Sequence, residues 1–542
     1  MKKLTLIVAA LALMMGFSQC KKDNLTPNDN RIQITLNANY CGAKTTFDPV
    51  GGTFAWNTSA TEYINVGGSS SGYLGQLDNS AAKGTGTFTG TLDKNPIDNE
   101  NLYFFYLGNG SRPDARTLSF SNQDGTLANL TNCYVAISDG VKYTGQTDFS
   151  AELKMKIAIA YLNTSVFAGE YVYLTGDDIY SNVVVNYRYG TITPYEKGYV
   201  KCGSANDGVY IALVPSTESE TTLKFESNSK TGSEITFLRG IKEGSYYSNS
   251  GDALTIPTPI EVTGTDAIKG LFSVSDSKMV RFSRGNLLFT RESTDDDWST
   301  GSWSFMTNQY DVVETANVSA DYASETAIGL FGWGTSGYNA RNTETNYYYK
   351  PFQTNSDNGS YYGPASNTSL IDTYSNCDWG VYNSTSITNG GGYDTWRVLS
   401  NAEWQYVLNQ RSASTINNTD NARYVKVTVG SMRGIIMFPD GYTHPNDVKA
   451  PTNINPGYLY TWQSFTVEEF NKMANNGAVF LPAAGYRVSG TTIDYYNNTC
   501  YYWTSTSSST TDAYRLYIAN GSVTFNNNVK RYLGCSVRLV RE

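Results

Sequence analysis

The chain has 542 residues, of which 40% are hydrophobic, 13% aromatic and only 16% charged. A hydrophobic fraction of this size can build large cores, which excludes a disordered chain, and the length predicts about three or four domains. The net charge of -9 argues against a nucleic-acid-binding surface, because phosphate neutralisation needs clustered cations. His444 is the single histidine, so a metal site built on several histidines of one chain is excluded. The composition favours a surface-binding or structural protein over an enzyme.

The amino terminus has the pattern of a secretory signal peptide. Two lysines precede an apolar run over residues 4–17, which is too short to span a bilayer comfortably. The run closes at Ser-Gln-Cys20, which resembles a bacterial lipobox. This resemblance implies that residues 1–20 are a lipoprotein signal peptide and that Cys20 carries the acyl chains, more than one of which gives stable anchoring. Residues 21–30 are expected to be a polar tether, and the charges after Cys20 resemble the surface-export signal of Bacteroidales-type outer-membrane lipoproteins.

The remaining cysteines are spread along the whole chain. An oxidising exterior permits pairing, but spacing alone does not fix the connectivity. Cys500 and Cys535 are the predicted pair, because both lie at the ends of candidate neighbouring strands. The alternative is that several of these residues are buried free thiols. They are Cys41, Cys133, Cys202, Cys377, Cys500 and Cys535.

Short alternating runs dominate the first half of the chain. Apolar and polar residues alternate with period two between clusters of glycine, asparagine and serine, a pattern typical of half-buried antiparallel strands. No helix-period segment of convincing length interrupts these runs. The sequence therefore predicts two consecutive β-sandwiches, over residues 31–145 and 146–265. Examples of the runs are residues 32–36, 62–66, 102–106, 153–160 and 210–214.

The same half contains a series of short motifs: Phe54-Ala55-Trp56, Ile64-Asn65-Val66, Phe88-Thr89-Gly90-Thr91-Leu92, Leu213-Val214-Pro215 and Gly244-Ser245-Tyr246-Tyr247. With these motifs the chain resembles the fimbrillin-like family of Bacteroidales-type pili over about residues 31–262. The resemblance implies a fimbrial subunit that is exported as a lipoprotein and loses its first strand to a trypsin-like protease. Another subunit then inserts a strand into the vacated groove.

In this chain the strand that would be removed is residues 32–40. Lys44, directly before Thr45, is the expected cleavage point, although members of the family commonly carry arginine there. Arg31 is the alternative, but a cut at that position would free no groove. A disulfide between Cys41 and Cys133 would keep the first strand tethered after cleavage, and would count against strand exchange.

From about residue 266 the chain contains more tryptophan, longer loops and helical segments. Ser400 with Glu403, and Thr466 with Glu469, have the spacing of capping boxes, so both pairs predict helix starts. The apolar residues that follow recur at intervals of three and four, as on one face of a helix. Residues 266–542 are therefore predicted to form an α+β module.

Four motifs of this module lie at residues 396–404, 481–487, 502–506 and 534–540. They resemble those of the Fibrobacter-type major paralogous domain. The resemblance implies a fold similar to C-type lectins and formylglycine-generating enzymes, so the whole chain is predicted to be mainly β with an α+β carboxyl-terminal domain. The Glu-Pro-Asn and Gln-Pro-Asp loops of calcium-dependent lectins are absent from the sequence, which argues against calcium-dependent sugar binding. No cofactor or metal is indicated.

Several residue types in this module could carry chemistry. We expect Asp295-Asp296-Asp297 to be solvated, His444 to be structural beside a Pro-Asp-Gly turn, and the arginines of the motifs, Arg397, Arg487 and Arg538, to pair with Glu403 or with backbone carbonyls. Rigid aromatic rings give contact area at low entropic cost. Tyrosine-rich loops are therefore the candidate ligand contacts, at Tyr347, Tyr348, Tyr361 and Tyr362.

Together these features predict a surface-exposed outer-membrane lipoprotein that acts in adhesion as a fimbrial tip or accessory subunit. Its partners would be other fimbrial subunits and a protein or glycan of a host or bacterial surface. Residues 537–540 are expected to complete a strand of their own domain, leaving no donor tail. The alternative is a lipoprotein outside any pilus that captures glycans through the module, and a third hypothesis is a hydrolase that uses a carboxylate pair.

Overall fold

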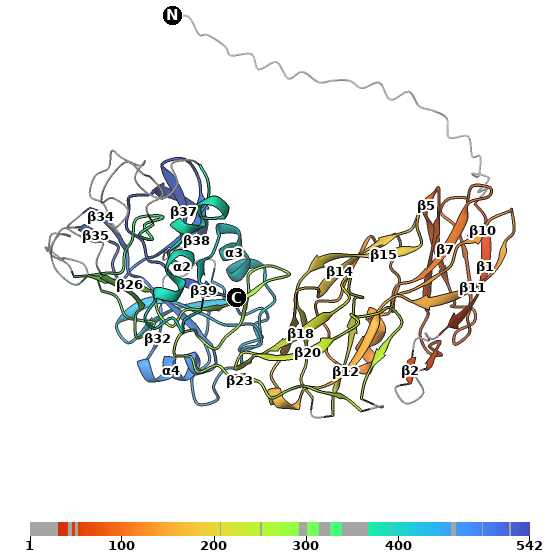
Figure 1. Ribbon diagram of the computed structural model, residues 1–542, viewed down its shortest axis with the longest axis horizontal. Coiled ribbons are helices and arrows are strands. Elements are labelled where there is room, and N and C mark those ends of the chain that lie inside the picture. The colour runs from red at the N-terminus through yellow and green to blue at the C-terminus, as the bar shows by residue number, and fades with distance from the viewer. Residues whose placement is uncertain are drawn as a thin grey trace, which may run out of the picture.

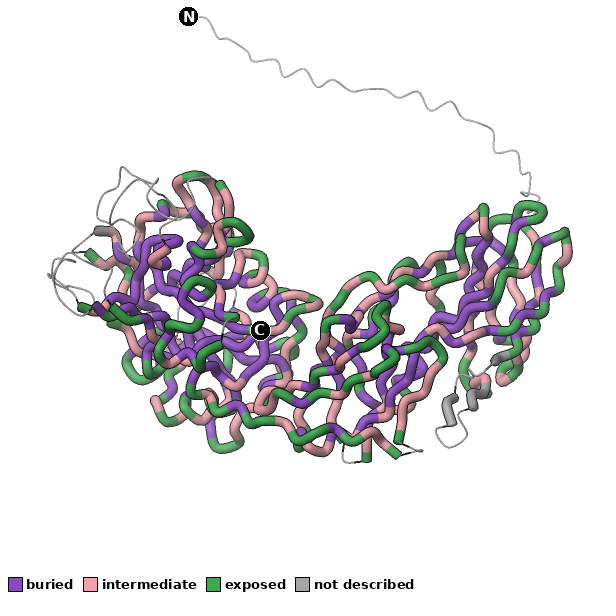
Figure 2. The backbone as a smooth tube through the Cα atoms, viewed as in Figure 1, coloured by how far each residue is buried: buried purple, intermediate pink, exposed green. Residues whose placement is uncertain are grey.

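The computed structural model is mainly β, as predicted, and three parts follow one another along its long axis (Figure 1). Buried backbone runs through the interior of each part (Figure 2). Among the described residues, no helix has the length and apolar character of a membrane span. The structure describes residues 31–542 except 42–45, 49–52, 206, 250–251, 292–300, 314–325, 339–366, 394, 457–461, 490–491 and 520–521.

The first part is built on one sheet in the order β10-β7-β4-β5-β6-β1-β11-β9. An additional pairing of β9 with β7 joins the two ends of this path, so the sheet closes on itself. Hairpin β2–β3 and helix α1 lie outside the sheet. The elements are β1 (Gln33–Cys41), β2 (Thr46–Asp48), β3 (Thr53–Ala55), β4 (Tyr63–Gly68), β5 (Gly72–Asp78), β6 (Thr87–Thr91), β7 (Asn101–Tyr106), α1 (Leu127–Leu130), β9 (Ala136–Ser138), β10 (Val141–Lys142) and β11 (Asp148–Met155).

The position of β11 corrects the predicted boundary between the two sandwiches. The sequence prediction starts the second sandwich at residue 146, but β11 pairs in parallel with β1 over seven partners, from Thr35–Asp148 to Cys41–Lys154. Its inward residues belong to the core of the first part. The alternation in residues 148–155 identifies a strand correctly, but alternation carries no information about which strand is its neighbour.

Two four-stranded sheets enclose the core of the second part, and two smaller sheets flank them. The first sheet contains β17, β12, β21 and β22, and the second has the order β16-β13-β18-β20. The strands are β12 (Ala158–Asn163), β13 (Val172–Thr175), β16 (Val200–Cys202), β17 (Val209–Leu213), β18 (Thr221–Glu226), β19 (Lys230–Thr231), β20 (Ser233–Phe237), β21 (Tyr246–Tyr247), β22 (Leu254–Thr255) and β23 (Ile260–Glu261).

A three-stranded sheet fastens the first two parts together. Strand β8 (Thr117–Ser119) comes from the first part and pairs with β14 (Tyr180–Asn186), which also pairs with β15 (Thr191–Lys197). The inward residues Val183, Val185 and Tyr187 belong to the same hydrophobic cluster as the core of the first sheet. The second part therefore adds residues to the core of the first and also has a separate core of its own.

In the described residues, the carboxyl-terminal part combines several small sheets with the short helices α2, α3 and α4. Both predicted capping boxes are confirmed: Ser400 caps α3 with Glu403, and Thr466 caps α4 with Glu469. The helices are α2 (Trp379–Asn383), α3 (Asn401–Gln405) and α4 (Val467–Asn475). The strands are β24 (Phe272–Ser273), β25 (Met279–Phe282), β26 (Leu287–Arg291), β27 (Gly301–Phe305), β28 (Ala327–Ile328), β29 (Arg397–Val398), β30 (Tyr424–Val429), β31 (Met432–Met437), β32 (Gln463–Phe465), β33 (Val479–Pro482), β34 (Tyr486–Ser489), β35 (Thr492–Asp494), β36 (Cys500–Ser507), β37 (Asp512–Ala519), β38 (Ser522–Lys530) and β39 (Leu539–Arg541).

The predicted Cys500–Cys535 disulfide is wrong, because the structure leaves both residues as free buried thiols. The residue after Cys535 bridges to Tyr502 of β36, so the two segments are neighbours as expected. The side chains nevertheless enter different clusters, Cys500 with Trp404 and Cys535 with Trp503, because successive residues of a strand point to opposite faces. Burial raises the pKa of the Cys500 thiol to about 12. Cys133 and Cys202 are also free and buried, and Cys377 is buried.

Candidate functional site: the β1 slot and the junction of the carboxyl-terminal module

Strand β1 occupies an internal position of the first sheet. It pairs antiparallel with β6 from Gln33–Thr91 to Asn37–Thr87, and parallel with β11 on its other side. Ile34, Leu36 and Ala38 are 1%, 0% and 4% exposed and belong to the main core cluster. The intervening residues are partly or fully exposed. The strand therefore fills a slot that is apolar on one face and hydrogen-bonded along both edges.

The backbone of β1 is anchored at several points. Thr35 N–H donates to Thr147 O at 2.8 Å and Ala38 N–H donates to Gly86 O at 2.7 Å, while Ile32 O accepts from Leu92 N–H at 2.9 Å. Buried backbone groups that lose their partners carry a free-energy penalty. If β1 were removed, its neighbours would expose unpaired groups on two edges beside an open apolar trough. Such a gap favours replacement by another strand.

Close packing fixes the register of β1 at its carboxyl-terminal end. A Cβ atom added at Gly86 would lie 2.1 Å from Ala38 O, so only glycine permits the approach of these two backbones. Nearby, the rings of Trp56 and Phe88 meet edge to face at a centroid distance of 4.9 Å. Trp56 belongs to a motif of the fimbrillin-like resemblance, and it packs against the same core that β1 covers.

Most of the predicted site residues lie outside the described part of the chain. These are the lipidation site Cys20, the cleavage point Lys44, the tyrosines Tyr347, Tyr348, Tyr361 and Tyr362, and the acidic run of residues 295–297. Arg31 is described, and its exposed side chain lies just before β1. Lys44 follows β1 in the chain and Arg31 precedes it, so of these two positions only Lys44 would separate β1 from the rest of the chain if it were cut; cleavage at either position stays a prediction.

His444 and Arg397 have the structural roles predicted for them, whereas the buried Arg538 binds side-chain oxygens of Gln309 and Asn286 and, among the described residues, neither Glu403 nor a backbone carbonyl. His444 lies between Tyr442 OH at 3.2 Å from Nδ1 and Val448 O at 3.1 Å from Nε2. Arg397 forms a bidentate ion pair with Glu403, with distances of 2.8 and 3.0 Å. Burial would raise the pKa of Glu403, but the charge and hydrogen bonds of Arg397 lower it below its usual value. Arg538 donates to Gln309 Oε1 at 3.0 Å.

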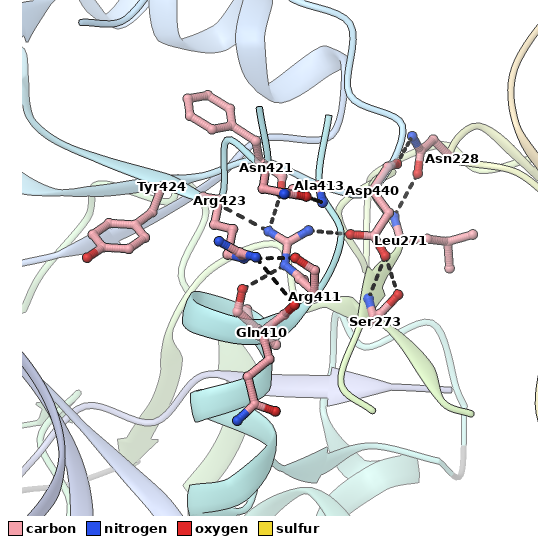
Figure 3. Close-up of polar contacts among 12 residues, drawn as sticks. Asn228, Leu271, Ser273, Gln410, Arg411, Ala413, Asn421, Arg423, Tyr424 and Asp440 are labelled. Carbon is pink, nitrogen blue, oxygen red and sulfur yellow. Dashed lines mark hydrogen bonds and ion pairs between the residues drawn. The ribbon is translucent and has the colours of Figure 1, made fainter. Parts of the chain in front are cut away.

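A buried ion pair lies where the module meets the second sandwich (Figure 3). Helix α3 continues as a π-helical turn over residues 406–410, after which the Arg411 N–H donates to Tyr406 O at 3.0 Å. The Arg411 side chain is fully buried, donates from Nε to Val407 O at 2.7 Å and pairs through Nη1 with Asp440 Oδ1. Asp440 Oδ2 also accepts a hydrogen bond of 3.0 Å from the backbone N–H of Ser273. The pair is thereby fixed between α3 and the Pro-Asp-Gly turn.

Asn228 of the second sandwich extends this network across the junction (Figure 3). It donates from Nδ2 to Asp440 O at 2.9 Å and accepts at Oδ1 from Leu271 N–H at 2.9 Å. Its own carbonyl accepts from Arg281 Nη1 at 2.8 Å, and Arg281 Nη2 reaches Ser227 O at 2.6 Å. Burial lowers the pKa of Arg281 to about 10, so it remains cationic at neutral pH. Directed hydrogen bonds, most of them partly buried, therefore link the module to the second sandwich.

The sequence analysis did not predict that Arg411, Asp440 and Arg281 belong to one hydrogen-bonded network. The predicted Pro-Asp-Gly turn is confirmed, because residues 440 and 441 form a turn and Gly441 has φ of 69°. From the sequence alone, Asp440 is expected to be only a turn residue, and Arg411 lies in a polar stretch after a predicted helix. To predict that Arg411 and Asp440 form an ion pair, one would need to know which loops lie next to each other in the folded protein. The local sequence does not contain that information.

Comparison with known proteins gives similarities in structure alone. No family model and no curated protein matches this chain. A chain named "putative cell adhesion protein" from Bacteroides uniformis aligns at 10% identity and a TM-score of 0.27, covering 42% of this chain and 97% of that one. A fimbrial protein from Bacteroides ovatus aligns at 11% identity and a TM-score of 0.23, covering 94% and 100%. A fimbrial assembly protein from Parabacteroides distasonis aligns at 8% identity and a TM-score of 0.21, covering 46% and 94%. TM-scores this far below 0.5 do not establish a shared fold.

Proposed function

We propose that the protein is a surface adhesion subunit of a fimbrium, at its tip or as an accessory subunit, and that it joins its neighbour by accepting a strand in place of β1. The observation that carries the proposal is the internal position of β1, whose inward side chains Ile34, Leu36 and Ala38 are buried. A strand at a shielded edge could leave without opening a groove. Loss of β1 instead opens a slot with partners on both sides.

The incoming strand has to satisfy the same geometry. Backbone hydrogen bonds to β6 and β11 supply affinity that is independent of sequence, and apolar residues at every second position supply register. Cleavage after Lys44 supplies the vacancy. Acylation of Cys20 would hold the chain at the outer membrane until that cut, so that export precedes assembly.

A position at the tip is supported by the pairing of β39. This strand lies between β25 and β29, and its residues Leu539 and Val540 are fully buried. It is committed to its own sheet and is not a free donor for another subunit. A tip subunit needs an acceptor slot and does not donate a strand, and the engagement of β39 in its own sheet supports that position.

Sequencing the amino terminus of the mature protein isolated from cells tests whether the chain is cleaved after Lys44. A mature chain that starts at Thr45 supports the proposal, and a chain that retains acylated Cys20 at all stages contradicts it. Lys44→Gln is expected to leave β1 in place and to keep the protein out of purified fimbriae, while the control Lys94→Gln, at an exposed loop position, assembles normally.

The position within the fimbrium has its own test. An antibody to residues 266–542 is expected to label one end of purified fimbriae, and labelling along the whole shaft would refute a tip. A protein that never assembles, yet binds glycans through residues 266–542, would support the non-pilus capture lipoprotein instead.

A further inference from the structure

A cavity of about 440 Å³ lies between the second sandwich and the carboxyl-terminal module. Strands β13, β15 and β18 of the sandwich contribute to its lining, and β25, the turn before it and the chain's last residues contribute from the module. Ligand sites often form at such domain interfaces, and this volume lies within their usual range of about 300–1,000 Å³. The buried contacts of Asn228 and Arg281 hold the two parts together beside it, so the cavity is preformed.

The lining is rich in cations although the chain is acidic overall. Lys197, Lys224 and Lys278 reach the cavity from three different elements and are exposed. In the described part of the chain, Lys224 forms no ion pair. The other two have only long ones, with Nζ 3.8 Å from a carboxylate oxygen of Asp178 or Glu542. The protein as a whole has a net charge of -9, so a cavity lined by three lysines differs from the rest of the molecule.

Two of the three acidic residues in the same lining contact arginines. Glu226 faces the buried guanidinium of Arg281 at 3.6 Å, and Glu542 contacts Arg397 at 3.1 Å. Asp177 is exposed, and its backbone carbonyl accepts from Lys197 Nζ at 2.5 Å. The ammonium group of Lys224 thus remains available to a ligand, that of Lys278 has to give up only a long ion pair, and that of Lys197 has to exchange a short hydrogen bond for a contact with the ligand.

The walls of the cavity suit a compact ligand with both polar and apolar faces. Leu271, Met279 and the rings of Tyr173 and Tyr199 supply apolar surface, and Ser277 supplies a hydroxyl group. We propose that this cavity binds an acidic sugar, whose carboxylate or sulfate group contacts the three lysines while the pyranose ring packs on the apolar wall. This proposal does not depend on strand exchange, because every residue in it lies away from β1.

An extended acidic peptide fits the site less well than a sugar. Peptides commonly bind as an added strand at a sheet edge, and the edge strand beside the cavity is β15. Pro194 lies within β15 and lacks the N–H that an added strand would need. The cavity is also compact, whereas strand addition requires a long open edge.

Calorimetric titration of the intact, uncleaved chain with digalacturonic acid and with a sulfated chondroitin disaccharide tests the proposal. Either probe is expected to bind, lactose is not, and added salt should weaken binding because the contacts are ionic. Lys224→Gln should weaken binding about tenfold, the size expected for loss of one charge-assisted hydrogen bond, and Lys224→Glu should abolish it. The control Lys142→Gln, at an exposed lysine of β10 without an ion pair among the described residues, should bind like the wild type.

Several outcomes would overturn the proposal. They are binding of neither acidic probe, equal binding of lactose, and equal affinities of the Lys224 variants and the wild type, with folding verified by circular dichroism. Binding of hexaglutamate in preference to both sugars would assign the cavity to an acidic peptide instead and also overturns it. Because the chain is uncleaved and unassembled, failure here is distinct from failure of fimbrial assembly.

Discussion

Arg411 illustrates how a buried charge can be held in this protein. Its side chain is fully buried and Asp440 is 3% exposed, so the environment must replace the water that each charge loses. Carbonyl oxygens of Val407 and Phe438 accept from the guanidinium in addition to the Asp440 carboxylate. A pair of this kind is costly to break, because the remaining partner keeps its charge without compensation.

We therefore expect Arg411→Met to lower the free energy of unfolding by about 3–5 kcal/mol, the range for a buried pair that loses one partner. Denaturant unfolding followed by tryptophan fluorescence measures the change. Lys472→Met is the matched control, because Lys472 pairs with Asp447 at 2.8 Å on an exposed surface and should leave unfolding unchanged. Equal effects of the two substitutions would contradict this account of the junction.

Glu403 makes a prediction about pH. Its pKa is lowered in the folded protein by Arg397, so its ionised form contributes stability that is present above the usual value of 4.5 and is lost as the pH falls through the lowered value. Glu403→Gln keeps an acceptor for the capping box but removes the charge. The melting temperature of this variant should lie below that of the wild type at pH 7, and the difference should close on acidification below pH 4.5. A constant difference at every pH would contradict the role of the charge.

The residues that could be recognised from sequence are mainly structural. Trp396, Trp404 and Trp503, from the motifs of the carboxyl-terminal module, are fully buried, and Trp503 donates from its ring nitrogen to Phe331 O at 2.6 Å. Large aromatic residues at fixed spacing are typical of a packed core, and such spacing can be recognised in the sequence. Lys224 and Lys278 resemble any exposed lysine in sequence, and only the junction of two parts brings them to one cavity.

At the scale of elements, β1 shows what alternation can and cannot predict. The pattern of Ile34, Leu36 and Ala38 identifies the strand and its inward face, and the structure agrees. The parallel pairing with β11 and the closure of the sheet through β7 and β9 were not predicted. These depend on the path of the chain between strands, which local periodicity does not encode.

The slot gives a prediction that distinguishes the faces of β1. In a chain with a specific protease site inserted over residues 42–45, the cut strand should stay bound and exchange with a labelled peptide of residues 31–41. Leu36→Asp in that peptide should prevent exchange, because it places a charge in an apolar trough, whereas Asn37→Asp, on the exposed face, should be tolerated. Gel filtration of the labelled complex measures exchange. If both peptides exchange equally, side chains do not set the register.

At the scale of the whole molecule, two different devices join the three parts. Residues of β14 extend the hydrophobic core of the first part into the second, whereas polar contacts, several of them at Asn228, link the module to the second sandwich. This one residue contacts Asp440, Leu271 and Arg281. A shared core resists bending in every direction, and a polar junction is rigid only while its hydrogen bonds are complete.

The final prediction concerns that junction. The second sandwich and the module of the wild type should unfold in a single calorimetric transition, because breaking the junction exposes paired buried groups on both sides. Asn228→Ala with Arg281→Met should separate this into two transitions and increase the maximum dimension measured by small-angle X-ray scattering, since the module is then free to swing. Asn526→Ala, at an exposed position of the module, is the control and should change neither measurement. Two transitions in the wild type would show that the parts unfold independently, and a single transition in the double variant would show that other contacts carry the coupling.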